Sequence, residues 1–207
     1  DEDCLYRCFG VDAELLIDHA NGIEPVTIAD IKAYKPKTNC LTSGQVLMRD
    51  YTYDEARLIV AEMTDALCLD LVEKELVTQS VTIHIGYSNS EDTAPTHATT
   101  QIERETSSDS ILCPRVCELF DKTVNRRAMV RRIHITFNKV TPKCDAEQLS
   151  FFEEEDNSIK KHQNIQKTVI DIKKKFGKNS ILKGMNLKEG ATAKERNMQI
   201  GGHKSGT

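Results

Sequence analysis

Four arginines lie within seven positions of the chain, at Arg126, Arg127, Arg131 and Arg132. A guanidinium presents a planar fork of N–H donors that matches the oxygens of a phosphate. Such a cluster can hold a nucleic-acid backbone without reading its sequence, and the binding weakens steeply with salt. The alternative is a solvated surface cluster without a ligand. The arginines therefore make phosphate binding the first chemistry to consider.

A second segment has the composition of a short motif that docks into a partner protein. Gln148-Leu149-Ser150-Phe151-Phe152 directly precedes three consecutive glutamates. Exposed Leu and Phe side chains are unfavourable in a polar segment unless they dock somewhere. They can fill a partner's pocket while the Gln amide adds a directed hydrogen bond. Alternatively, they pack back on their own domain.

The residue types that carry catalysis or bind metals are present but not arranged for it. No Gly-rich phosphate loop follows a predicted strand, no nucleophile elbow occurs, and the carboxylate runs are not spaced to converge on one site. Cys4/Cys8 and Cys113/Cys117 have the i, i+4 spacing of one helix face rather than that of a zinc site. Structural thiols are predicted at Cys68, Cys113 and Cys117, because these cysteines lie among apolar residues. The pattern disfavours an enzyme in its own right, such as a small nuclease.

Composition and charge indicate one core domain with extensions. The 207 residues are 39% hydrophobic, and no apolar run approaches the roughly 20 residues of a membrane-spanning helix. Reduced cysteines and an acidic start that is unlike a signal peptide favour a cytoplasmic protein without membrane contact. The net charge of −4 divides into −5, −2 and +3 over residues 1–36, 37–143 and 144–207. No segment has the strong basic excess of an autonomous, high-affinity nucleic-acid binder.

The hydrophobic pattern predicts an α+β unit over residues 38–142. Strands are predicted near 41–48, 80–87, 97–104 and 132–138, and period-two alternation marks the second and the last of them. One helix follows the capping box that runs from Thr52 to Glu55, and another follows Ser108-Asp109-Ser110. The order β-α-β-β-α-β favours a split-βαβ arrangement, in which a four-stranded sheet carries both helices on one face.

The other face of this predicted sheet is left bare. Its candidate side chains can all form hydrogen bonds, and none is acidic: Thr82, His84, Thr99, Gln101, Arg132, His134, Thr136 and Asn138. A solvated antiparallel face often has this composition without any ligand. The lack of acids in an acidic chain instead favours a negatively charged partner. His97 joins two histidines of this face, and we expect them to donate hydrogen bonds to phosphate or water rather than to bind metal.

Both flanks of the α+β unit differ from it in pattern. Residues 1–20 predict two short helices separated by Gly10, and residues 21–37 predict an extended linker because prolines disfavour helix at the preceding residue. Residues 143–158 are acidic and turn-like. Residues 159–176 predict a basic amphipathic helix. Residues 177–207 are rich in Gly, Lys and Asn and predict a mobile end. The apolar face of that helix comprises Ile159, His162, Ile165, Val169, Ile172 and Phe176.

Three of these pieces occur in the order found in one enzyme family. Phe9-Gly10-Val11-Asp12-Ala13-Glu14-Leu15-Leu16, leading to Gly22-Ile23-Glu24-Pro25, resembles the end of the thumb and the linker of Y-family (UmuC/DinB-type) translesion DNA polymerases. Residues 38–142 resemble their little finger domain, which lies in the DNA major groove. Gln148–Phe152 closely resembles the Gln-Leu-x-Leu-Phe motif by which bacterial members bind the sliding clamp. The resemblance covers residues 1–152 and implies a thumb remnant (1–20), a linker (21–37), a little finger (38–142), a clamp-binding segment (143–158) and an extension (159–207).

The resemblance implies that the chain is the DNA-binding and clamp-tethering C-terminal part of an error-prone translesion polymerase acting in DNA repair and the SOS response. Its partners would be damaged template–primer DNA and the bacterial sliding clamp. The palm and fingers of such enzymes carry the active site, so this segment would have no catalytic residue and no cofactor, whereas the whole polymerase would use Mg²⁺. The alternative is a protein-interaction module that binds the clamp without DNA.

The resemblance also assigns residues to these roles. DNA contacts fall on Thr42, Ser43, Gly44, Gln45, Thr99, Thr100, Gln101, Arg104, Arg131 and Arg132, and clamp contacts on Gln148, Leu149, Phe151 and Phe152. Two features depart from the family's pattern. The third strand is often Arg-rich in relatives, but here only Arg104 is basic, and 55 residues follow the clamp motif where relatives often end.

Overall fold

A computed structural model describes residues 1–34, 39–90, 92–144, 153–200 and 203–204 of the protein, with the backbone alone at 153–160, 200, 203 and 204. The chain divides into two compact units, Asp1–Lys37 and Thr38–Thr207.

The first unit is helical. It contains α1 (Glu2–Phe9), α2 (Asp12–Ala20) and α3 (Ile28–Ala33). Gly10, with φ 57°, separates α1 from α2, which confirms the predicted break. The prediction of an extended linker over 21–37 is wrong at α3. Thr27 and Asp30 form a reciprocal capping box there, which satisfies the first N–H groups of a short helix.

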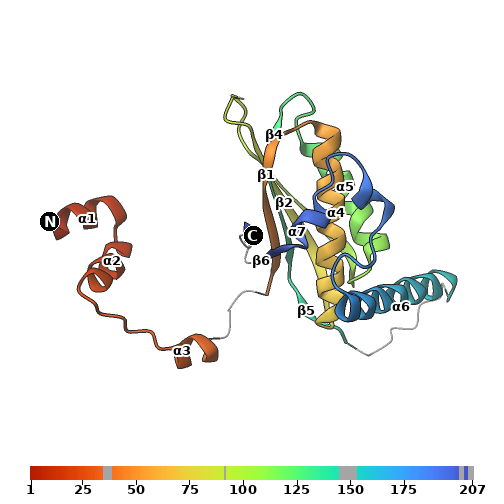
Figure 1. Cartoon of the computed structure of the whole chain (residues 1–207), viewed down its shortest axis with the longest axis horizontal. Coiled ribbons are helices and arrows are strands. Elements are labelled where there is room, and N and C mark those ends of the chain that lie inside the picture. Colours follow the sequence, from red (N-terminus) through yellow and green to blue (C-terminus); the bar gives the residue numbers. More distant parts are fainter. Residues whose placement is uncertain (35–38, 91, 145–152, 201–202, 205–207) are drawn as a thin grey trace. The chain divides into compact units, whose positions relative to one another are not determined.

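The second unit has the predicted β-α-β-β-α-β order (Figure 1). Its elements are β1 (Leu41–Tyr51), α4 (Tyr53–Glu73), β2 (Leu76–Tyr87), β3 (Thr96–Thr106), α5 (Asp109–Thr123) and β4 (Val130–Asn138). The strand order is β1-β4-β2-β3 with antiparallel neighbours, and the short β5 (Thr141–Pro142) pairs with β2. Because β4 lies between β1 and β2, the expected split-βαβ arrangement is confirmed. Figure 1 shows α4 and α5 together on one side of the sheet.

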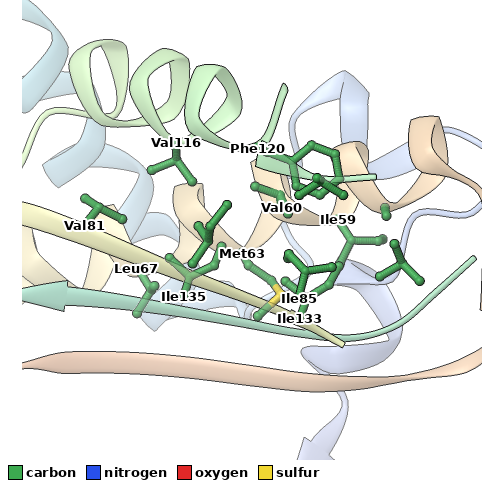
Figure 2. Close-up of a cluster of buried hydrophobic side chains, with 14 of the residues drawn as sticks. Ile59, Val60, Met63, Leu67, Val81, Ile85, Val116, Phe120, Ile133 and Ile135 are labelled. Carbon is green, nitrogen blue, oxygen red and sulfur yellow. The ribbon is translucent and has the colours of Figure 1, made fainter. Parts of the chain in front are cut away.

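The hydrophobic core lies between these two helices and one face of the sheet. Thr52 and Glu55 form the predicted capping box at the start of α4. Figure 2 shows side chains of both helices meeting those of β2 and β4. The labelled residues are Ile59, Val60, Met63, Leu67, Val81, Ile85, Val116, Phe120, Ile133 and Ile135, and each is at most 2% exposed. Burying a side chain of this size contributes about 1.5–3 kcal/mol to folding stability. Burial of these residues therefore fixes which side of each strand faces the core, and the alternate residues face outward.

The helix after the α+β unit differs from the prediction. This helix, α6, spans Glu153–Phe176, so residues 153–158 are helical rather than turn-like. Its packed side is marked by buried Gln166 and Ile170, whereas Ile165 and Phe176 are 51% and 66% exposed. Contacts with α4 and α5 determine which side of α6 is buried. On that side, the Gln166 side-chain amide donates to the Ser107 carbonyl at 3.5 Å. The apolar face predicted for this helix is therefore largely not the face that packs.

The segment after α6, over its described residues 177–200 and 203–204, has secondary structure where its composition predicts a mobile end. It forms a 3-10 helix η1 (Gly184–Leu187), α7 (Ala193–Arg196) and a small hairpin of β6 (Gln199–Ile200) and β7 (His203–Lys204). Its anchor is Glu62 of α4, which is only 2% exposed. The Glu62 carboxylate accepts hydrogen bonds from Asn186 Nδ2 at 2.8 Å, Thr192 N at 2.9 Å and Ala193 N at 3.2 Å. A buried carboxylate that needs donors thus orders a polar segment with little apolar surface of its own.

Candidate nucleic-acid interface

The sheet face that α4 and α5 leave uncovered is lined by the eight predicted side chains. Cross-strand partners point to the same face, and the register pairs Thr136 with Thr82, His134 with His84, and Asn138 with Ser80 opposite Gln101. The face is exposed or half-buried at each of the eight positions. The prediction that these eight side chains share the uncovered face is confirmed. We call it the open face.

A row of hydroxyls crosses the open face from β1 to β3. Thr42 Oγ1 lies 3.0 Å from Thr136 Oγ1, and Thr82 Oγ1 lies 2.8 Å from Thr99 Oγ1. Asn138 Nδ2 donates to Thr82 Oγ1 at 2.8 Å. These bonds fix the rotamers of the row while leaving further donor and acceptor capacity at each hydroxyl. A fixed row of small polar groups can follow a phosphate backbone without distinguishing bases.

A parallel row contains three histidines. The register places Gly44 opposite His134, His134 opposite His84, and His84 opposite His97. The ring centroids of His84 lie 6.0 Å from those of His134 and 6.1 Å from those of His97. The His134 ring lies over β1, where a Cβ at Gly44 would be 2.4 Å from its Nδ1. The glycine is therefore required for this ring position rather than for a turn.

The two arginines at the start of β4 point to different sides. Arg132 is exposed on the open face, where it lies against Gly86. Arg131 is turned toward Asp50 and makes an ion pair at 3.6 Å. Alternation along the strand separates the two neighbours, so of the pair Arg132 is the one whose side chain lies on the open face.

The other two predicted arginines lie in the loop before β4. Arg126 stacks over the Tyr53 ring with its guanidinium carbon 4.8 Å from the centroid. Tyr53 Oη donates to Asp121 at 2.6 Å, and Arg57 Nε donates to the same carboxylate at 2.7 Å. The hydrogen bond from Arg57 holds the pKa of Asp121 below its ordinary value. Both arginines are exposed, but Arg126 also belongs to this cluster between α4 and α5.

Three residues that the family resemblance assigns to DNA do not face outward. Ser43 and Gln45 pair with buried Ile135 and Ile133 and therefore point toward the helices. Gln45 Oε1 accepts hydrogen bonds from Thr192 Oγ1 at 3.2 Å and Arg196 Nη1 at 3.4 Å in the C-terminal segment. Thr100 pairs with buried Val81 on the same inner side. Of these residues, Gln45 ties β1 to the C-terminal segment, and the side chains of all three point away from the open face.

The end of β3 carries mixed charge. Arg104 and Glu103 are both exposed there, next to an irregularity in the pairing with β2. Glu103 makes an ion pair with Arg115 of α5 at 3.6 Å. The remaining predicted site, Gln148, Leu149, Phe151 and Phe152, lies outside the described residues.

Of the three cysteines predicted to be structural thiols, two are buried and Cys113 is half-buried. Cys68 and Cys117 are buried, and burial raises the pKa of both thiols, with a hydrogen bond to Cys113 adding to the effect at Cys68. Among the described residues, no group of three or more His, Cys, Asp or Glu side chains is placed to hold a metal ion.

Within the described part of the chain, no helix has both the length and the apolar character needed to cross a membrane.

One polar cluster, formed by Lys183, Asp65 and Asp109, was not predicted from the sequence. Lys183, after α6, bridges Asp65 of α4 at 2.6 Å and Asp109 of α5 at 2.5 Å. Burial disfavours the charge of Lys183, but the hydrogen bonds to Asp109 and Asp65 outweigh it and raise the Lys183 pKa above its ordinary value. A signal was available: Glu62 and Asp65 interrupt the buried side of the helix that contains Ile59 and Met63, and buried acids require partners.

Comparison with known proteins relates this architecture to one family. The model of the impB/mucB/samB family C-terminal domain matches residues 41–151, more than half of the chain. "DNA polymerase IV 2" of Halalkalibacterium halodurans is 26% identical over 196 residues, which are 94% of this chain and 46% of that protein. The chain thus spans less than half the length of this curated relative.

Two solved structures are also similar. One is a Y-family DNA polymerase chimera of Dbh and Dpo4, with a TM-score of 0.41 and 16% identity. The other is an insertion ternary complex of Dbh DNA polymerase, with a TM-score of 0.38 and 15% identity. Each match covers 69% of this chain and 39% of the solved chain.

Proposed function

Because the chain belongs to the impB/mucB/samB family and contains its C-terminal domain, we propose that it is the DNA-gripping part of a Y-family translesion DNA polymerase. The nucleotidyl transfer and its Mg²⁺ ions are assigned in this proposal to the palm of the whole enzyme. The segment described here would position template–primer DNA, including damaged DNA, through its backbone.

The observation that carries the proposal is the composition of the open face. Within the regular cross-strand register it presents hydroxyls, imidazoles, amides and Arg132, without a carboxylate. The opposite face and the helices hold most of the ion pairs that the structure describes, including those of Asp121 and Asp65. A polyanion would therefore meet hydrogen-bond donors and no regular-register carboxylate on the open face. Backbone contacts without base contacts suit an enzyme that must accept altered bases.

Salt-dependent binding tests this proposal. A labelled primer–template duplex is titrated with the chain by fluorescence anisotropy over a series of salt concentrations. The logarithm of affinity should fall linearly with the logarithm of salt concentration, as expected for release of counterions. Arg132→Gln should weaken binding and reduce the magnitude of the slope of log affinity against log salt concentration by about one. Arg127→Gln removes an exposed arginine off the face and serves as the matched control. Equal losses in both variants, or no binding at low salt, would exclude the open face as the grip.

The finer part of the proposal concerns the sliding clamp. The similarity of Gln148–Phe152 to a clamp-binding motif supports a tether that keeps the polymerase on DNA, in the bacterial cytoplasm and in the response to DNA damage. Calorimetry with a purified bacterial sliding clamp should give weak binding, on the order of micromolar. The double variant Phe151→Ala/Phe152→Ala should abolish it. Clamp binding by a chain that shows no salt-dependent DNA affinity would favour the protein-interaction alternative.

A further inference from the structure

The histidine row is a concentration of titratable groups at the centre of the open face. Its three imidazoles come from three adjacent strands, and the neighbouring rings lie 6.0 and 6.1 Å apart. His97 and His134 are exposed, and His84 between them is half-buried. The row is continuous with the threonine row because each strand contributes a threonine two residues away from its histidine.

The charged neighbours of the row can be followed strand by strand. On β1, the side of the row is formed by Thr42, Gly44 and Val46, which carry no charge. On β4, Arg132 is the charged residue of the open face, two positions from His134. On β2, Thr82 and Gly86 flank His84.

On β3, Thr99 and Gln101 follow His97, and the charged residues Glu103, Arg104 and Glu105 begin only after them. Glu103 is engaged with Arg115, and Glu105 Oε2 accepts from Thr141 Oγ1 at 3.5 Å. Along the regular register of the described strands, therefore, no carboxylate lies beside the imidazoles. A phosphate backbone laid along the face would supply the missing negative charge.

We propose that the histidine row, His134–His84–His97, is a proton-dependent phosphate-binding element, so that DNA binding by the open face is coupled to proton uptake. This inference rests on the proposed DNA grip and adds to it the groups that respond to pH. Histidine is the side chain whose charge ordinarily changes between about pH 5 and 8. An imidazolium gains a second N–H donor and a positive charge, and both favour a phosphate oxygen.

The spacing limits how many protons the row takes up. Imidazolium charges about 6 Å apart repel one another, so three full charges are not expected without several phosphates at hand. Uptake of about one proton per bound duplex corresponds to about a tenfold gain in affinity for each unit that the pH falls. The row would tighten the grip in mildly acidic conditions and loosen it in alkaline ones, on top of the constant contribution of Arg132.

Calorimetry of the whole chain with a primer–template duplex measures this uptake directly. The titration is repeated at one near-neutral pH in two buffers with different ionisation enthalpies, with a chelator present so that no adventitious metal bridges the rings. The difference in binding heat gives the number of protons taken up. The wild type is compared with His84→Gln/His97→Gln/His134→Gln, which keeps polar side chains on the strands. A second triple variant, His19→Gln/His162→Gln/His203→Gln, changes the histidines outside the row.

The expected result is proton uptake by the wild type and by the control variant, and none by the row variant. The row variant should still bind DNA with salt dependence, because Arg132 and the threonines remain. Salt-dependent binding with no proton uptake by the wild type would overturn the inference and leave the DNA grip standing. Uptake that persists in the row variant would also overturn it, since the protons would then enter elsewhere. Absence of DNA binding at both acidic and alkaline pH would remove the grip and the inference together.

Discussion

The docking of the C-terminal segment on α4 should make a large contribution to the stability of the second unit. Glu62→Ala removes the acceptor of three donors, Asn186 Nδ2, Thr192 N and Ala193 N, at a site that is 2% exposed. A hydrogen bond to a charged group is worth about 1.5–3 kcal/mol, so a simple sum gives roughly 4.5–9 kcal/mol. That sum is an upper bound, because the freed segment can undock and return its donors to water. We expect a loss of about 3 kcal/mol in the free energy of unfolding.

Urea unfolding and hydrogen exchange measure the two parts of this effect. The midpoint should fall in Glu62→Ala, and amide protection should be lost first in residues 183–196, while β2 and β4 stay protected. Glu62→Gln keeps the volume but turns an amide group toward the N–H donors, so it separates lost acceptors from a cavity. Glu195→Ala, at an exposed position of α7, is the control and should stay within about 0.5 kcal/mol of wild type. If Glu62→Ala also stayed within that range with unchanged exchange over 183–196, the buried carboxylate would not anchor the segment.

Three further changes test other parts of the structure. The Arg49 hydrogen bond and the Thr52 backbone lower the Glu55 pKa from 4.5 to about 2, so its contribution to stability is present above pH 4.5 and lost as the pH falls through about 2. Glu55→Gln should therefore cost about 1 kcal/mol at neutral pH, with the difference from wild type vanishing in an acid series of urea melts. Gly44→Ala should preserve the fold but move the His134 ring, seen as a change of its imidazole NMR signals, and unchanged signals would contradict the close approach. Lys183→Met should destabilise the chain by about 1–2 kcal/mol in urea unfolding at neutral pH, because it leaves Asp65 and Asp109 without their shared cation, and an unchanged free energy of unfolding would contradict the ion bridge.

The sheet and its open face were predictable because period-two alternation is a local signal. Val81, Ile83 and Ile85 alternate with Thr82 and His84, and burial of one set fixes the other outward. The capping box at Thr52 is equally local, since both partners lie within one turn. Such features can be predicted because all the residues that determine them are close together in the sequence.

The failures arose where the deciding partner is distant in sequence. Gln45 lies in a strand that was predicted to contact phosphate, but its side chain accepts hydrogen bonds from Thr192 and Arg196, which are some 150 residues away in the sequence. The order of the tail depends on Glu62, which the helical pattern alone presents as one more charged residue. The short helix α3 differs from the predicted linker because the Thr27–Asp30 capping box starts a helix between Pro25 and Pro36.

We propose that the open face, and not the basic helix α6, contacts DNA. NMR titration of the isotopically labelled chain with a primer–template duplex tests this placement by mapping which amide and imidazole signals shift. We expect shifts along β1, β4, β2 and β3 at the threonine and histidine rows and at Arg132, with little change in α4, α5 and the tail docked on Glu62. Shifts confined to the lysines of α6, such as Lys161, Lys167 and Lys174, with an unchanged sheet would contradict it.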